Sequence, residues 1–159
     1  MQRILWKEAQ NYINTNQLHL LARNDDQNEI YKKDMDIIKQ KYKSISDYIL
    51  HNMLNYDTIT ENNKLVAITD TENINTGNQL IMLVPNHYPY YFEPTITQYV
   101  LWSNKEIDEN NIKTIIEDKL TYILNKSEPK YNEDYMYWIN PVELKSVLDV
   151  WHAHIIIKK

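Results

Sequence analysis

The hydrophobic pattern of this 159-residue chain changes its period near Leu54, and this change limits the folds that the chain can adopt. Between residues 28 and 54, apolar side chains recur at spacings of three and four, which places them on one face of a helix. These side chains are Ile38, Tyr42, Ile45, Ile49 and Met53. Ser44 can cap a fresh helical start, with Asp47 three residues on, and a further helix is predicted within the first twenty residues.

After Leu54, short apolar runs bounded by turn residues predict strands at 65–70, 79–84, 95–103, 135–139 and 150–157. A turn signal at Thr76-Gly77-Asn78 separates the first two runs, and Asp108 can cap a helix that runs to about Leu124. This order predicts an α+β fold, in which N-terminal helices pack with a mainly antiparallel five-stranded sheet and one crossover helix. We expect a single domain over 1–159, with a helical part at 1–56 and a sheet part with one helix at 57–159.

The composition excludes several classes of site. The chain has no cysteine, which removes disulfides, thiolate nucleophiles and cysteine-bound zinc. Its one glycine, Gly77, cannot build a Walker loop or a dinucleotide fingerprint, because both need several glycines for close backbone approach to phosphate. The sequence therefore predicts no cofactor, and any bound phosphate would be held by side chains or by a helix N-terminus.

The charge and hydropathy of the chain limit its partners. A formal net charge of −5 argues against coating a long duplex nucleic acid, but it permits binding of one nucleotide or a chain end. No run of 18 apolar residues exists and no signal peptide is recognisable, so we expect a cytoplasmic protein without membrane association. The lysines between positions 32 and 43 are expected to form a solvated helix face. Abundant Asn, Ile, Lys and Tyr fit an AT-rich genome, such as that of a protist or of a large DNA virus in its host's cytoplasm.

The segment VPNHYPYYFEP, residues 84–94, concentrates aromatic rings, prolines and an acid. Its prolines fix the backbone, which lowers the entropy lost when a ligand-facing loop becomes ordered. The rings of Tyr88 and Tyr90 could stack on a base, at about 1–3 kcal/mol per base, and Glu93 could accept hydrogen bonds from a guanine edge. In the alternative interpretation, the rings pack beneath the N-terminal helices and Glu93 caps a backbone turn. Trp102 is expected in the core or as the opposite wall of a base-binding slot.

Two histidines share one face of the last predicted strand. Side chains at i and i+2 of a strand point the same way, so His152 and His154 lie together while the alternate residues form core on the other face. The pair has three interpretations: structural hydrogen-bonded rings, contacts or catalysis at a phosphate, or metal ligands with a third group such as His87 or Glu93. The spacing does not decide among them, and we predict no metal.

The link before this strand carries a cation and a hydroxyl, Lys145 and Ser146, together with Asn140 at its start. Because the link is short, these side chains are expected near the histidines. A cation and a hydroxyl beside two imidazoles form a cluster that attracts an anion. The alternative is a surface lysine and a turn serine.

Several segments together resemble the fungal N-acetylglucosamine-induced-protein family, a domain of unknown function. The matching segments are N-H-Y-P-Y (86–90), E-P-x-I (93–96), V-L-W-S (100–103), N-x-x-x-L-K-S-V (140–147) and H-A-H-I (152–155), with R-N (23–24), Tyr31 and Y-K-S-I-S-D-Y-I-L (42–50) in the helical region. The chain departs from the family at His87, where an acid is usual, and at Gln98, where a histidine is expected. The resemblance implies the fold and the position of the site. The predicted site residues are Asn86, His87, Tyr88, Tyr90, Glu93, Trp102, Asn140, Lys145, Ser146, His152 and His154.

The order of strand, helix, strand and final histidine strand is also similar to the histidine-triad nucleotide hydrolases and transferases. In that family the central histidine of H-φ-H-φ-H attacks the α-phosphate, and His154 would match it, with His152 orienting or protonating. Here the third position is Ile156, and the glycine-rich approach is missing.

These features support three functional hypotheses. The first is a binding protein that recognises a nucleotide, such as a guanine nucleotide or the 5′ cap of an mRNA, by aromatic stacking and phosphate contacts. The second is a degenerate histidine-triad-like hydrolase or transferase with His154 as its catalytic nucleophile and His152 assisting. The third is an interaction module without a ligand, whose helical region binds a protein partner. We favour the first, because the missing glycines and third histidine argue against efficient catalysis.

Overall fold

The N-terminal helices form where the sequence predicts helical periodicity. The computed structural model describes residues 1–69 and 78–158. Its α-helices are α1 (Trp6–Asn14), α2 (Asp25–Lys41), α3 (Ile45–Leu54) and α4 (Glu109–Leu124), and its short 3-10 helices are η1 (Leu18–Leu20) and η2 (Val142–Leu144). Both predicted caps are confirmed, because Ser44 accepts from the Asp47 amide at the start of α3 and Asp108 accepts from the Asn110 amide at the start of α4.

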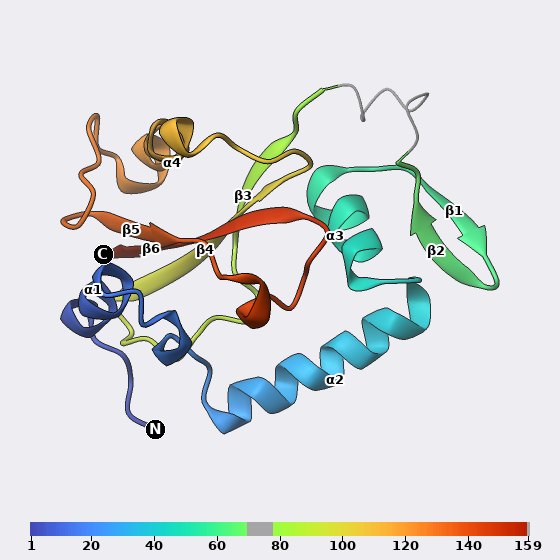
Figure 1. The fold of residues 1–159 in the computed structure, drawn as a ribbon, viewed down its shortest axis with the longest axis horizontal. Coiled ribbons are helices and arrows are strands. Elements are labelled where there is room, and N and C mark those ends of the chain that lie inside the picture. The colour runs from blue at the N-terminus through green and yellow to red at the C-terminus, as the bar shows by residue number, and fades with distance from the viewer. Residues whose placement is uncertain (70–77, 159) are drawn as a thin grey trace.

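The main sheet has four strands in the spatial order β3-β4-β6-β5. They are β3 (Ile81–Pro85), β4 (Ile96–Ser103), β5 (Tyr135–Trp138) and β6 (Trp151–Lys158). Every pairing is antiparallel, so β4 and β5 run parallel to each other with β6 inserted between them. The helix α4 is therefore the predicted crossover connection, and the α+β class is confirmed (Figure 1).

The prediction of five strands in one sheet needs a correction. Strand β2 (Lys64–Ala67) pairs with β1 (Thr58–Glu61) in a separate antiparallel hairpin, which the sequence analysis did not predict. Asn62 and Asn63 form its two-residue loop with φ angles of 49° and 64°. This left-handed geometry suits asparagine and matches a type I′ hairpin turn, so the Asn-Asn pair was the available signal. The last residue of the predicted strand 65–70, and most of the predicted turn after it, lie outside the described residues.

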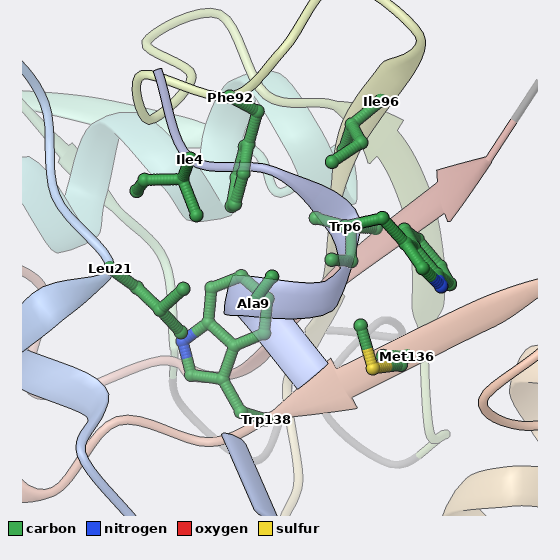
Figure 2. Packing of buried hydrophobic residues seen from close by; sticks show 9 residues of the cluster. Ile4, Trp6, Ala9, Leu21, Phe92, Ile96, Met136 and Trp138 are labelled. Atoms are coloured by element: carbon green, nitrogen blue, oxygen red, sulfur yellow. The ribbon is translucent and has the colours of Figure 1, made fainter. Parts of the chain in front are cut away.

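Helices cover both faces of the main sheet (Figure 1). On one face, α4 packs its aliphatic side chains against the odd-numbered residues of β6, such as Ile155 and Ile157. On the other face, Met136 and Trp138 of β5 are covered by α1, by the segment before α1 and by Leu21 (Figure 2). Further along that second face, α3 packs against β4. Both faces of β6 are therefore buried.

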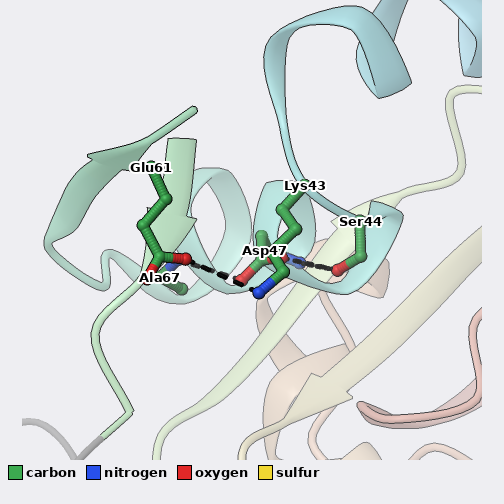
Figure 3. A network of polar contacts seen from close by, with 5 residues as sticks. All are labelled: Lys43, Ser44, Asp47, Glu61 and Ala67. Atoms are coloured by element: carbon green, nitrogen blue, oxygen red, sulfur yellow. Dashed lines mark hydrogen bonds and ion pairs between the residues drawn. The ribbon is translucent and has the colours of Figure 1, made fainter. Parts of the chain in front are cut away.

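The carboxylate of Asp47 joins α3 to the β1–β2 hairpin (Figure 3). Its Oδ1 accepts from the backbone N–H of Ala67 at 3.0 Å, and its Oδ2 accepts from the Ser44 hydroxyl at 2.6 Å. Beside it, the Lys43 ammonium lies 3.5 Å from Glu61, but both side chains are about half exposed, so this ion pair contributes little stability. Lys43 and the other lysines between positions 32 and 43 are exposed, as predicted.

Candidate functional site

The strand alternation of β6 places His152 and His154 on the face that the N-terminal helices cover. In the sheet register, Val100 lies opposite His154 and Trp102 lies opposite His152 on β4, while Trp138 lies opposite His154 on β5. His154 stacks on Trp138 with ring centroids 5.2 Å apart, and His152 lies 4.7 Å from Trp102. Their exposed fractions are only 4% for His152 and 7% for His154, and their ring centroids are 5.5 Å apart.

A pocket opens above the two histidines, between this face of the sheet, α2, α3 and the loop after β3. Its cavity volume is about 80 Å³, and it opens to solvent. Its aliphatic wall consists of Met35, Ile45, Ile49, Met53, Val84 and Val100. Its aromatic wall consists of Tyr31, Tyr48, Tyr88 and Trp102. Its polar lining consists of Arg23, Asn86, His87, Ser146, His152 and His154.

The hydrogen bonds of His154 fix the position of its ring proton. The backbone N–H of Tyr90 donates to Oε1 of Gln98 at 2.7 Å, so the amide nitrogen of Gln98 faces Nδ1 of His154 at 3.1 Å. An amide nitrogen only donates, which makes Nδ1 of His154 the acceptor and leaves the proton on Nε2.

His152 has the opposite tautomer. Its Nδ1 lies 2.9 Å from the carbonyl oxygen of Val150, which can only accept, so Nδ1 carries the proton and Nε2 keeps a lone pair. Among residues 1–69 and 78–158, neither Nε2 atom has a hydrogen-bond partner. In the same residues, every side-chain nitrogen or oxygen that is fully buried does have a partner, so the two Nε2 atoms are not fully buried. Both Nε2 atoms therefore reach the open space of the pocket that the two residues line.

Burial holds both imidazoles in the neutral form. It lowers the pKa of His154 to about 3, with smaller contributions from the neighbouring His152 ring and the Arg23 charge. Burial also lowers the pKa of His152, although its bond to the Val150 carbonyl acts in the opposite direction. Near neutral pH the two rings thus act as hydrogen-bonding groups without charge.

Arg23 supplies the positive charge of the pocket. Its guanidinium lies over the rings of Tyr31 and Tyr90, at 4.2 and 5.1 Å from their centroids, and its Nε donates to the Tyr88 carbonyl at 2.8 Å. Within the described part of the chain, no carboxylate forms a salt bridge with it. Burial lowers the pKa of this guanidinium, but an arginine stays charged at neutral pH. A half-buried cation without a counter-ion attracts anions.

The aromatic loop 86–93 divides between the pocket and the core. Asn86, His87 and Tyr88 line the pocket, and the Tyr88 hydroxyl donates to Asp34 at 2.9 Å, which together with burial raises the pKa of Tyr88 to about 12. Tyr90 instead packs against the ring of Phe92, which lies in the core cluster of Figure 2. The alternative interpretation, in which the rings pack beneath the N-terminal helices, therefore describes Tyr90 and Phe92.

Glu93 lies away from the pocket and closes a backbone turn, as the same alternative interpretation states. Its carboxylate accepts from the Thr95 hydroxyl at 2.5 Å and from the Trp6 backbone N–H at 3.0 Å, at the first residue of α1. These two bonds, the first more than the second, lower the pKa of Glu93. A carboxylate engaged at the start of a helix is not placed to read a base in the pocket.

The link residues lie around the pocket in different ways. Ser146 is exposed at its rim, and the charge of the nearby Lys145 contributes to the lowered pKa of His152. Asn140 is buried beyond the pocket, where it accepts from the Trp138 indole at 3.1 Å and donates to the Tyr90 hydroxyl at 3.2 Å. Asn140 and Tyr90 line a second cavity, which Arg23 also lines.

Two polar residues of the site, Arg23 and Gln98, were missed as site residues, and so were Tyr31, Tyr48 and the aliphatic wall of the pocket. Arg23 lies in the R-N segment that matched the family's helical region, and Gln98 was noted as a departure from the family. Both signals were therefore present, but only the fold brings these residues to the histidines, because Gln98 and His154 are 56 positions apart. No group of three histidines, aspartates or glutamates in 1–69 and 78–158 is arranged to hold a metal ion.

Comparison with known proteins identifies the family. Residues 5–158 match the family described as a protein of unknown function, DUF3605. The chain belongs to the DUF3605 family. A relative of this DUF3605 chain is N-acetylglucosamine-induced protein 1 of Candida albicans, which is 29% identical over 171 residues, covering 96% of this chain and 67% of that protein. The predicted family resemblance is thus confirmed, while the histidine-triad likeness and the viral source stay predictions.

The DUF3605 fold is similar to that in the crystal structure of HTC1. The TM-score is 0.64 with 20% identity, and the match covers 98% of this chain and 85% of the other. At that identity the likeness concerns the fold alone. No helix in the described parts of the chain is long and apolar enough to cross a membrane.

Proposed function

We propose that this DUF3605 protein binds a phosphate-bearing small molecule of the nucleotide class in the pocket above His152 and His154. The observation that carries the proposal is the Arg23 guanidinium, which is half-buried at the pocket without a carboxylate partner among the described residues. A phosphate oxygen accepts charge-assisted hydrogen bonds from a guanidinium, and the N–H of His154 adds a neutral donor. Because the chain has one glycine, a bound phosphate would be held by side chains or by a helix N-terminus, and Arg23 and His154 would supply such side chains.

The walls of the pocket suit the rest of a nucleotide. Tyr48 and Tyr88 offer aromatic surface for a base, and stacking contributes about 1–3 kcal/mol per base without selecting its identity. We do not expect Glu93 to recognise guanine, because its carboxylate accepts from the Trp6 backbone N–H at the start of α1. Recognition of an uncapped RNA 5′ end would then depend on its terminal phosphate, and recognition of a cap on its bridging phosphates.

Binding is favoured over hydrolysis by the hydrogen bonds of His154. A nucleophilic imidazole needs a free lone pair, but Nδ1 of His154 accepts from Gln98 and its Nε2 carries the proton. The hypothesis of a histidine-triad-like enzyme with His154 as nucleophile therefore receives no support from this geometry. The hypothesis of a protein partner for the helical region stays a prediction.

Calorimetric titration of the protein with 5′-AMP, 5′-GMP, the two nucleosides and inorganic phosphate tests the proposal. We expect micromolar binding of the mononucleotides and at least tenfold weaker binding of the nucleosides, because charged hydrogen bonds contribute about 1.5–3 kcal/mol. Arg23→Met should weaken nucleotide binding about 10- to 100-fold by the same reasoning.

Arg3→Met is a matched control. The Arg3 guanidinium also lies over a tyrosine ring, 4.6 Å from the centroid of Tyr91, and donates to a backbone carbonyl, but it does not line the pocket. We expect this variant to bind nucleotides as the natural protein does. Equal affinity in Arg23→Met, or no heat with any phosphate compound, would refute the proposal.

A further inference from the structure

The two imidazoles of the pocket offer different hydrogen-bonding groups to the same space. Nε2 of His154 is an N–H donor because Gln98 donates to its other nitrogen. Nε2 of His152 is an acceptor because its other nitrogen donates to the Val150 carbonyl. Both rings are more than nine-tenths buried, and neither Nε2 has a partner within the described residues.

Most phosphate sites present donors alone, because a phosphate oxygen without a proton only accepts. An acceptor such as Nε2 of His152 would repel the lone pairs of a fully ionised phosphate. It would instead match an oxyanion that retains one proton, while Nε2 of His154 and the guanidinium of Arg23 donate to the other oxygens. A phosphate monoester has such a proton to share near neutral pH, because its second pKa is about 6. A phosphate diester has none.

We propose that the pocket selects phosphate monoesters over diesters, with one proton shared between a phosphate oxygen and Nε2 of His152 and a second oxygen accepting from Nε2 of His154. This inference rests on the proposed function and names the class of phosphate that the site takes. The role of His152 is specificity, and no bond to phosphorus forms or breaks.

The proton balance follows from the neutral state of both rings before binding. A monoester monoanion brings its own proton, and its P–OH donates to Nε2 of His152. A dianion brings none, so one proton must come from solvent and lie either on the phosphate or on the imidazole. In both locations the complex holds one proton more than the free dianion and the free protein.

Several charged and titratable groups surround His152 and act on the shared proton. Arg23 faces the pocket from the segment before α2, and Lys145 acts on His152 from the link before β6. Tyr31 and Tyr48 face it from α2 and α3, and His87 and Tyr88 face it from the loop after β3. The nearby carboxylate of Asp34 is engaged by the Tyr88 hydroxyl. The positive groups favour the anion, but they also disfavour an added proton, and Lys145 adds to the effect of burial in lowering the pKa of His152. The proton is therefore held by the contact between a phosphate oxygen and the lone pair on Nε2 of His152.

Proton uptake on binding is the measurement that tests this inference. The protein would be titrated with 5′-AMP in buffers of different ionisation enthalpy, and the dependence of the observed heat on the buffer gives the number of protons taken up. At about pH 7.5, where the ligand is mainly a dianion, we expect uptake of between about one half and one proton. At about pH 5.5, uptake should fall to about a quarter of a proton, because most of the ligand is already the monoanion.

The matched ligand is 3′,5′-cyclic AMP, a diester with the same base and ribose. It should bind at least tenfold more weakly than 5′-AMP and without proton uptake. The matched variants are His152→Gln and His19→Gln, the second at an exposed histidine outside this pocket. An amide at 152 can turn its N–H₂ toward the dianion, so we expect proton uptake to be largely lost in His152→Gln and unchanged in His19→Gln.

A second measurement needs neither ligand nor variant. Long-range ¹H–¹⁵N spectra of the unliganded protein should show His154 protonated on Nε2 and His152 protonated on Nδ1. Reversed tautomers, binding of 5′-AMP without proton uptake, or equal affinity for the cyclic diester would each overturn this inference while leaving the phosphate site of the proposed function intact. Absence of binding by every phosphate compound would overturn both.

Discussion

The two faces of strand β6 are both covered by helices, yet they differ in chemistry. On the α4 face, Ala153, Ile155 and Ile157 are fully buried among aliphatic residues of the helix and of β4. On the opposite face, His152 and His154 lie among aromatic rings and Gln98, next to a pocket. The α4 face gains free energy simply from apolar burial, whereas the histidine face must satisfy each polar atom with a specific partner. The comparison indicates that the first face stabilises the fold and that the second holds the candidate site.

The largest expected effect lies on the α4 face. Leu120→Ala removes a fully buried side chain from this cluster and should lower the free energy of unfolding by about 2–5 kcal/mol, through lost burial and the cavity left behind. Urea unfolding measures the change, and nucleotide affinity of the folded variant should stay as it was. A Leu120→Ala protein with unchanged stability would contradict the assignment of this face to the core.

A loss of stability of similar size is expected on the histidine face, together with an effect on the site. Gln98→Leu leaves the Tyr90 N–H and Nδ1 of His154 without partners, and each unsatisfied buried group costs about 1–3 kcal/mol. The tautomer of His154 is then no longer fixed, so its ring nitrogens should give altered ¹⁵N shifts. Gln40→Leu, at an exposed glutamine of α2, is the control and should change neither quantity.

The pH dependence of stability distinguishes the two faces further. The folded-state pKa of His154 lies far below the unfolded value near 6.5, so the unfolded chain binds the proton first as pH falls. Its contribution to stability is complete above about pH 6.5 and declines below it, by about 1 kcal/mol between pH 6.5 and 5.5. Unfolding curves at those two pH values should show this loss in the natural protein and a smaller one in His154→Gln. Equal slopes would mean that His154 is not held neutral by burial.

The smallest effect is expected outside both faces. Tyr122 is on the outer side of α4 and is 90% exposed. Tyr122→Ser should shift the free energy of unfolding by less than about 0.5 kcal/mol, because surface substitutions away from specific contacts are nearly neutral. A loss comparable to that of Leu120→Ala would show that α4 has a second buried side and that the division into two faces is incomplete.

The parts of this structure that sequence could predict depend on short-range rules. Strand alternation placed His152 and His154 on one face, and capping rules placed the starts of α3 and α4 at Ser44 and Asp108. The hairpin was missed because the strand at 58–61 is short and mostly exposed, so its hydrophobic pattern is weak.

The parts that sequence could not predict depend on contacts between distant segments. Glu93 has the same local sequence whether it faces a ligand or caps α1, and the contact with Trp6 decides between the two across 87 positions. Likewise, Arg23 reaches the pocket only because its Nε bonds the Tyr88 carbonyl, 65 positions away. Such contacts follow from the packing of helices on the sheet, which no local pattern encodes.

A crystal structure of the complex with 5′-AMP tests the central claim most directly, namely that the polar face of β6 is a phosphate-binding site. The account predicts that the phosphate lies within hydrogen-bonding distance of the Arg23 guanidinium and of Nε2 of His154, with the base against the tyrosine wall. A ligand bound at another surface, or a pocket that holds only water at saturating nucleotide, would contradict it.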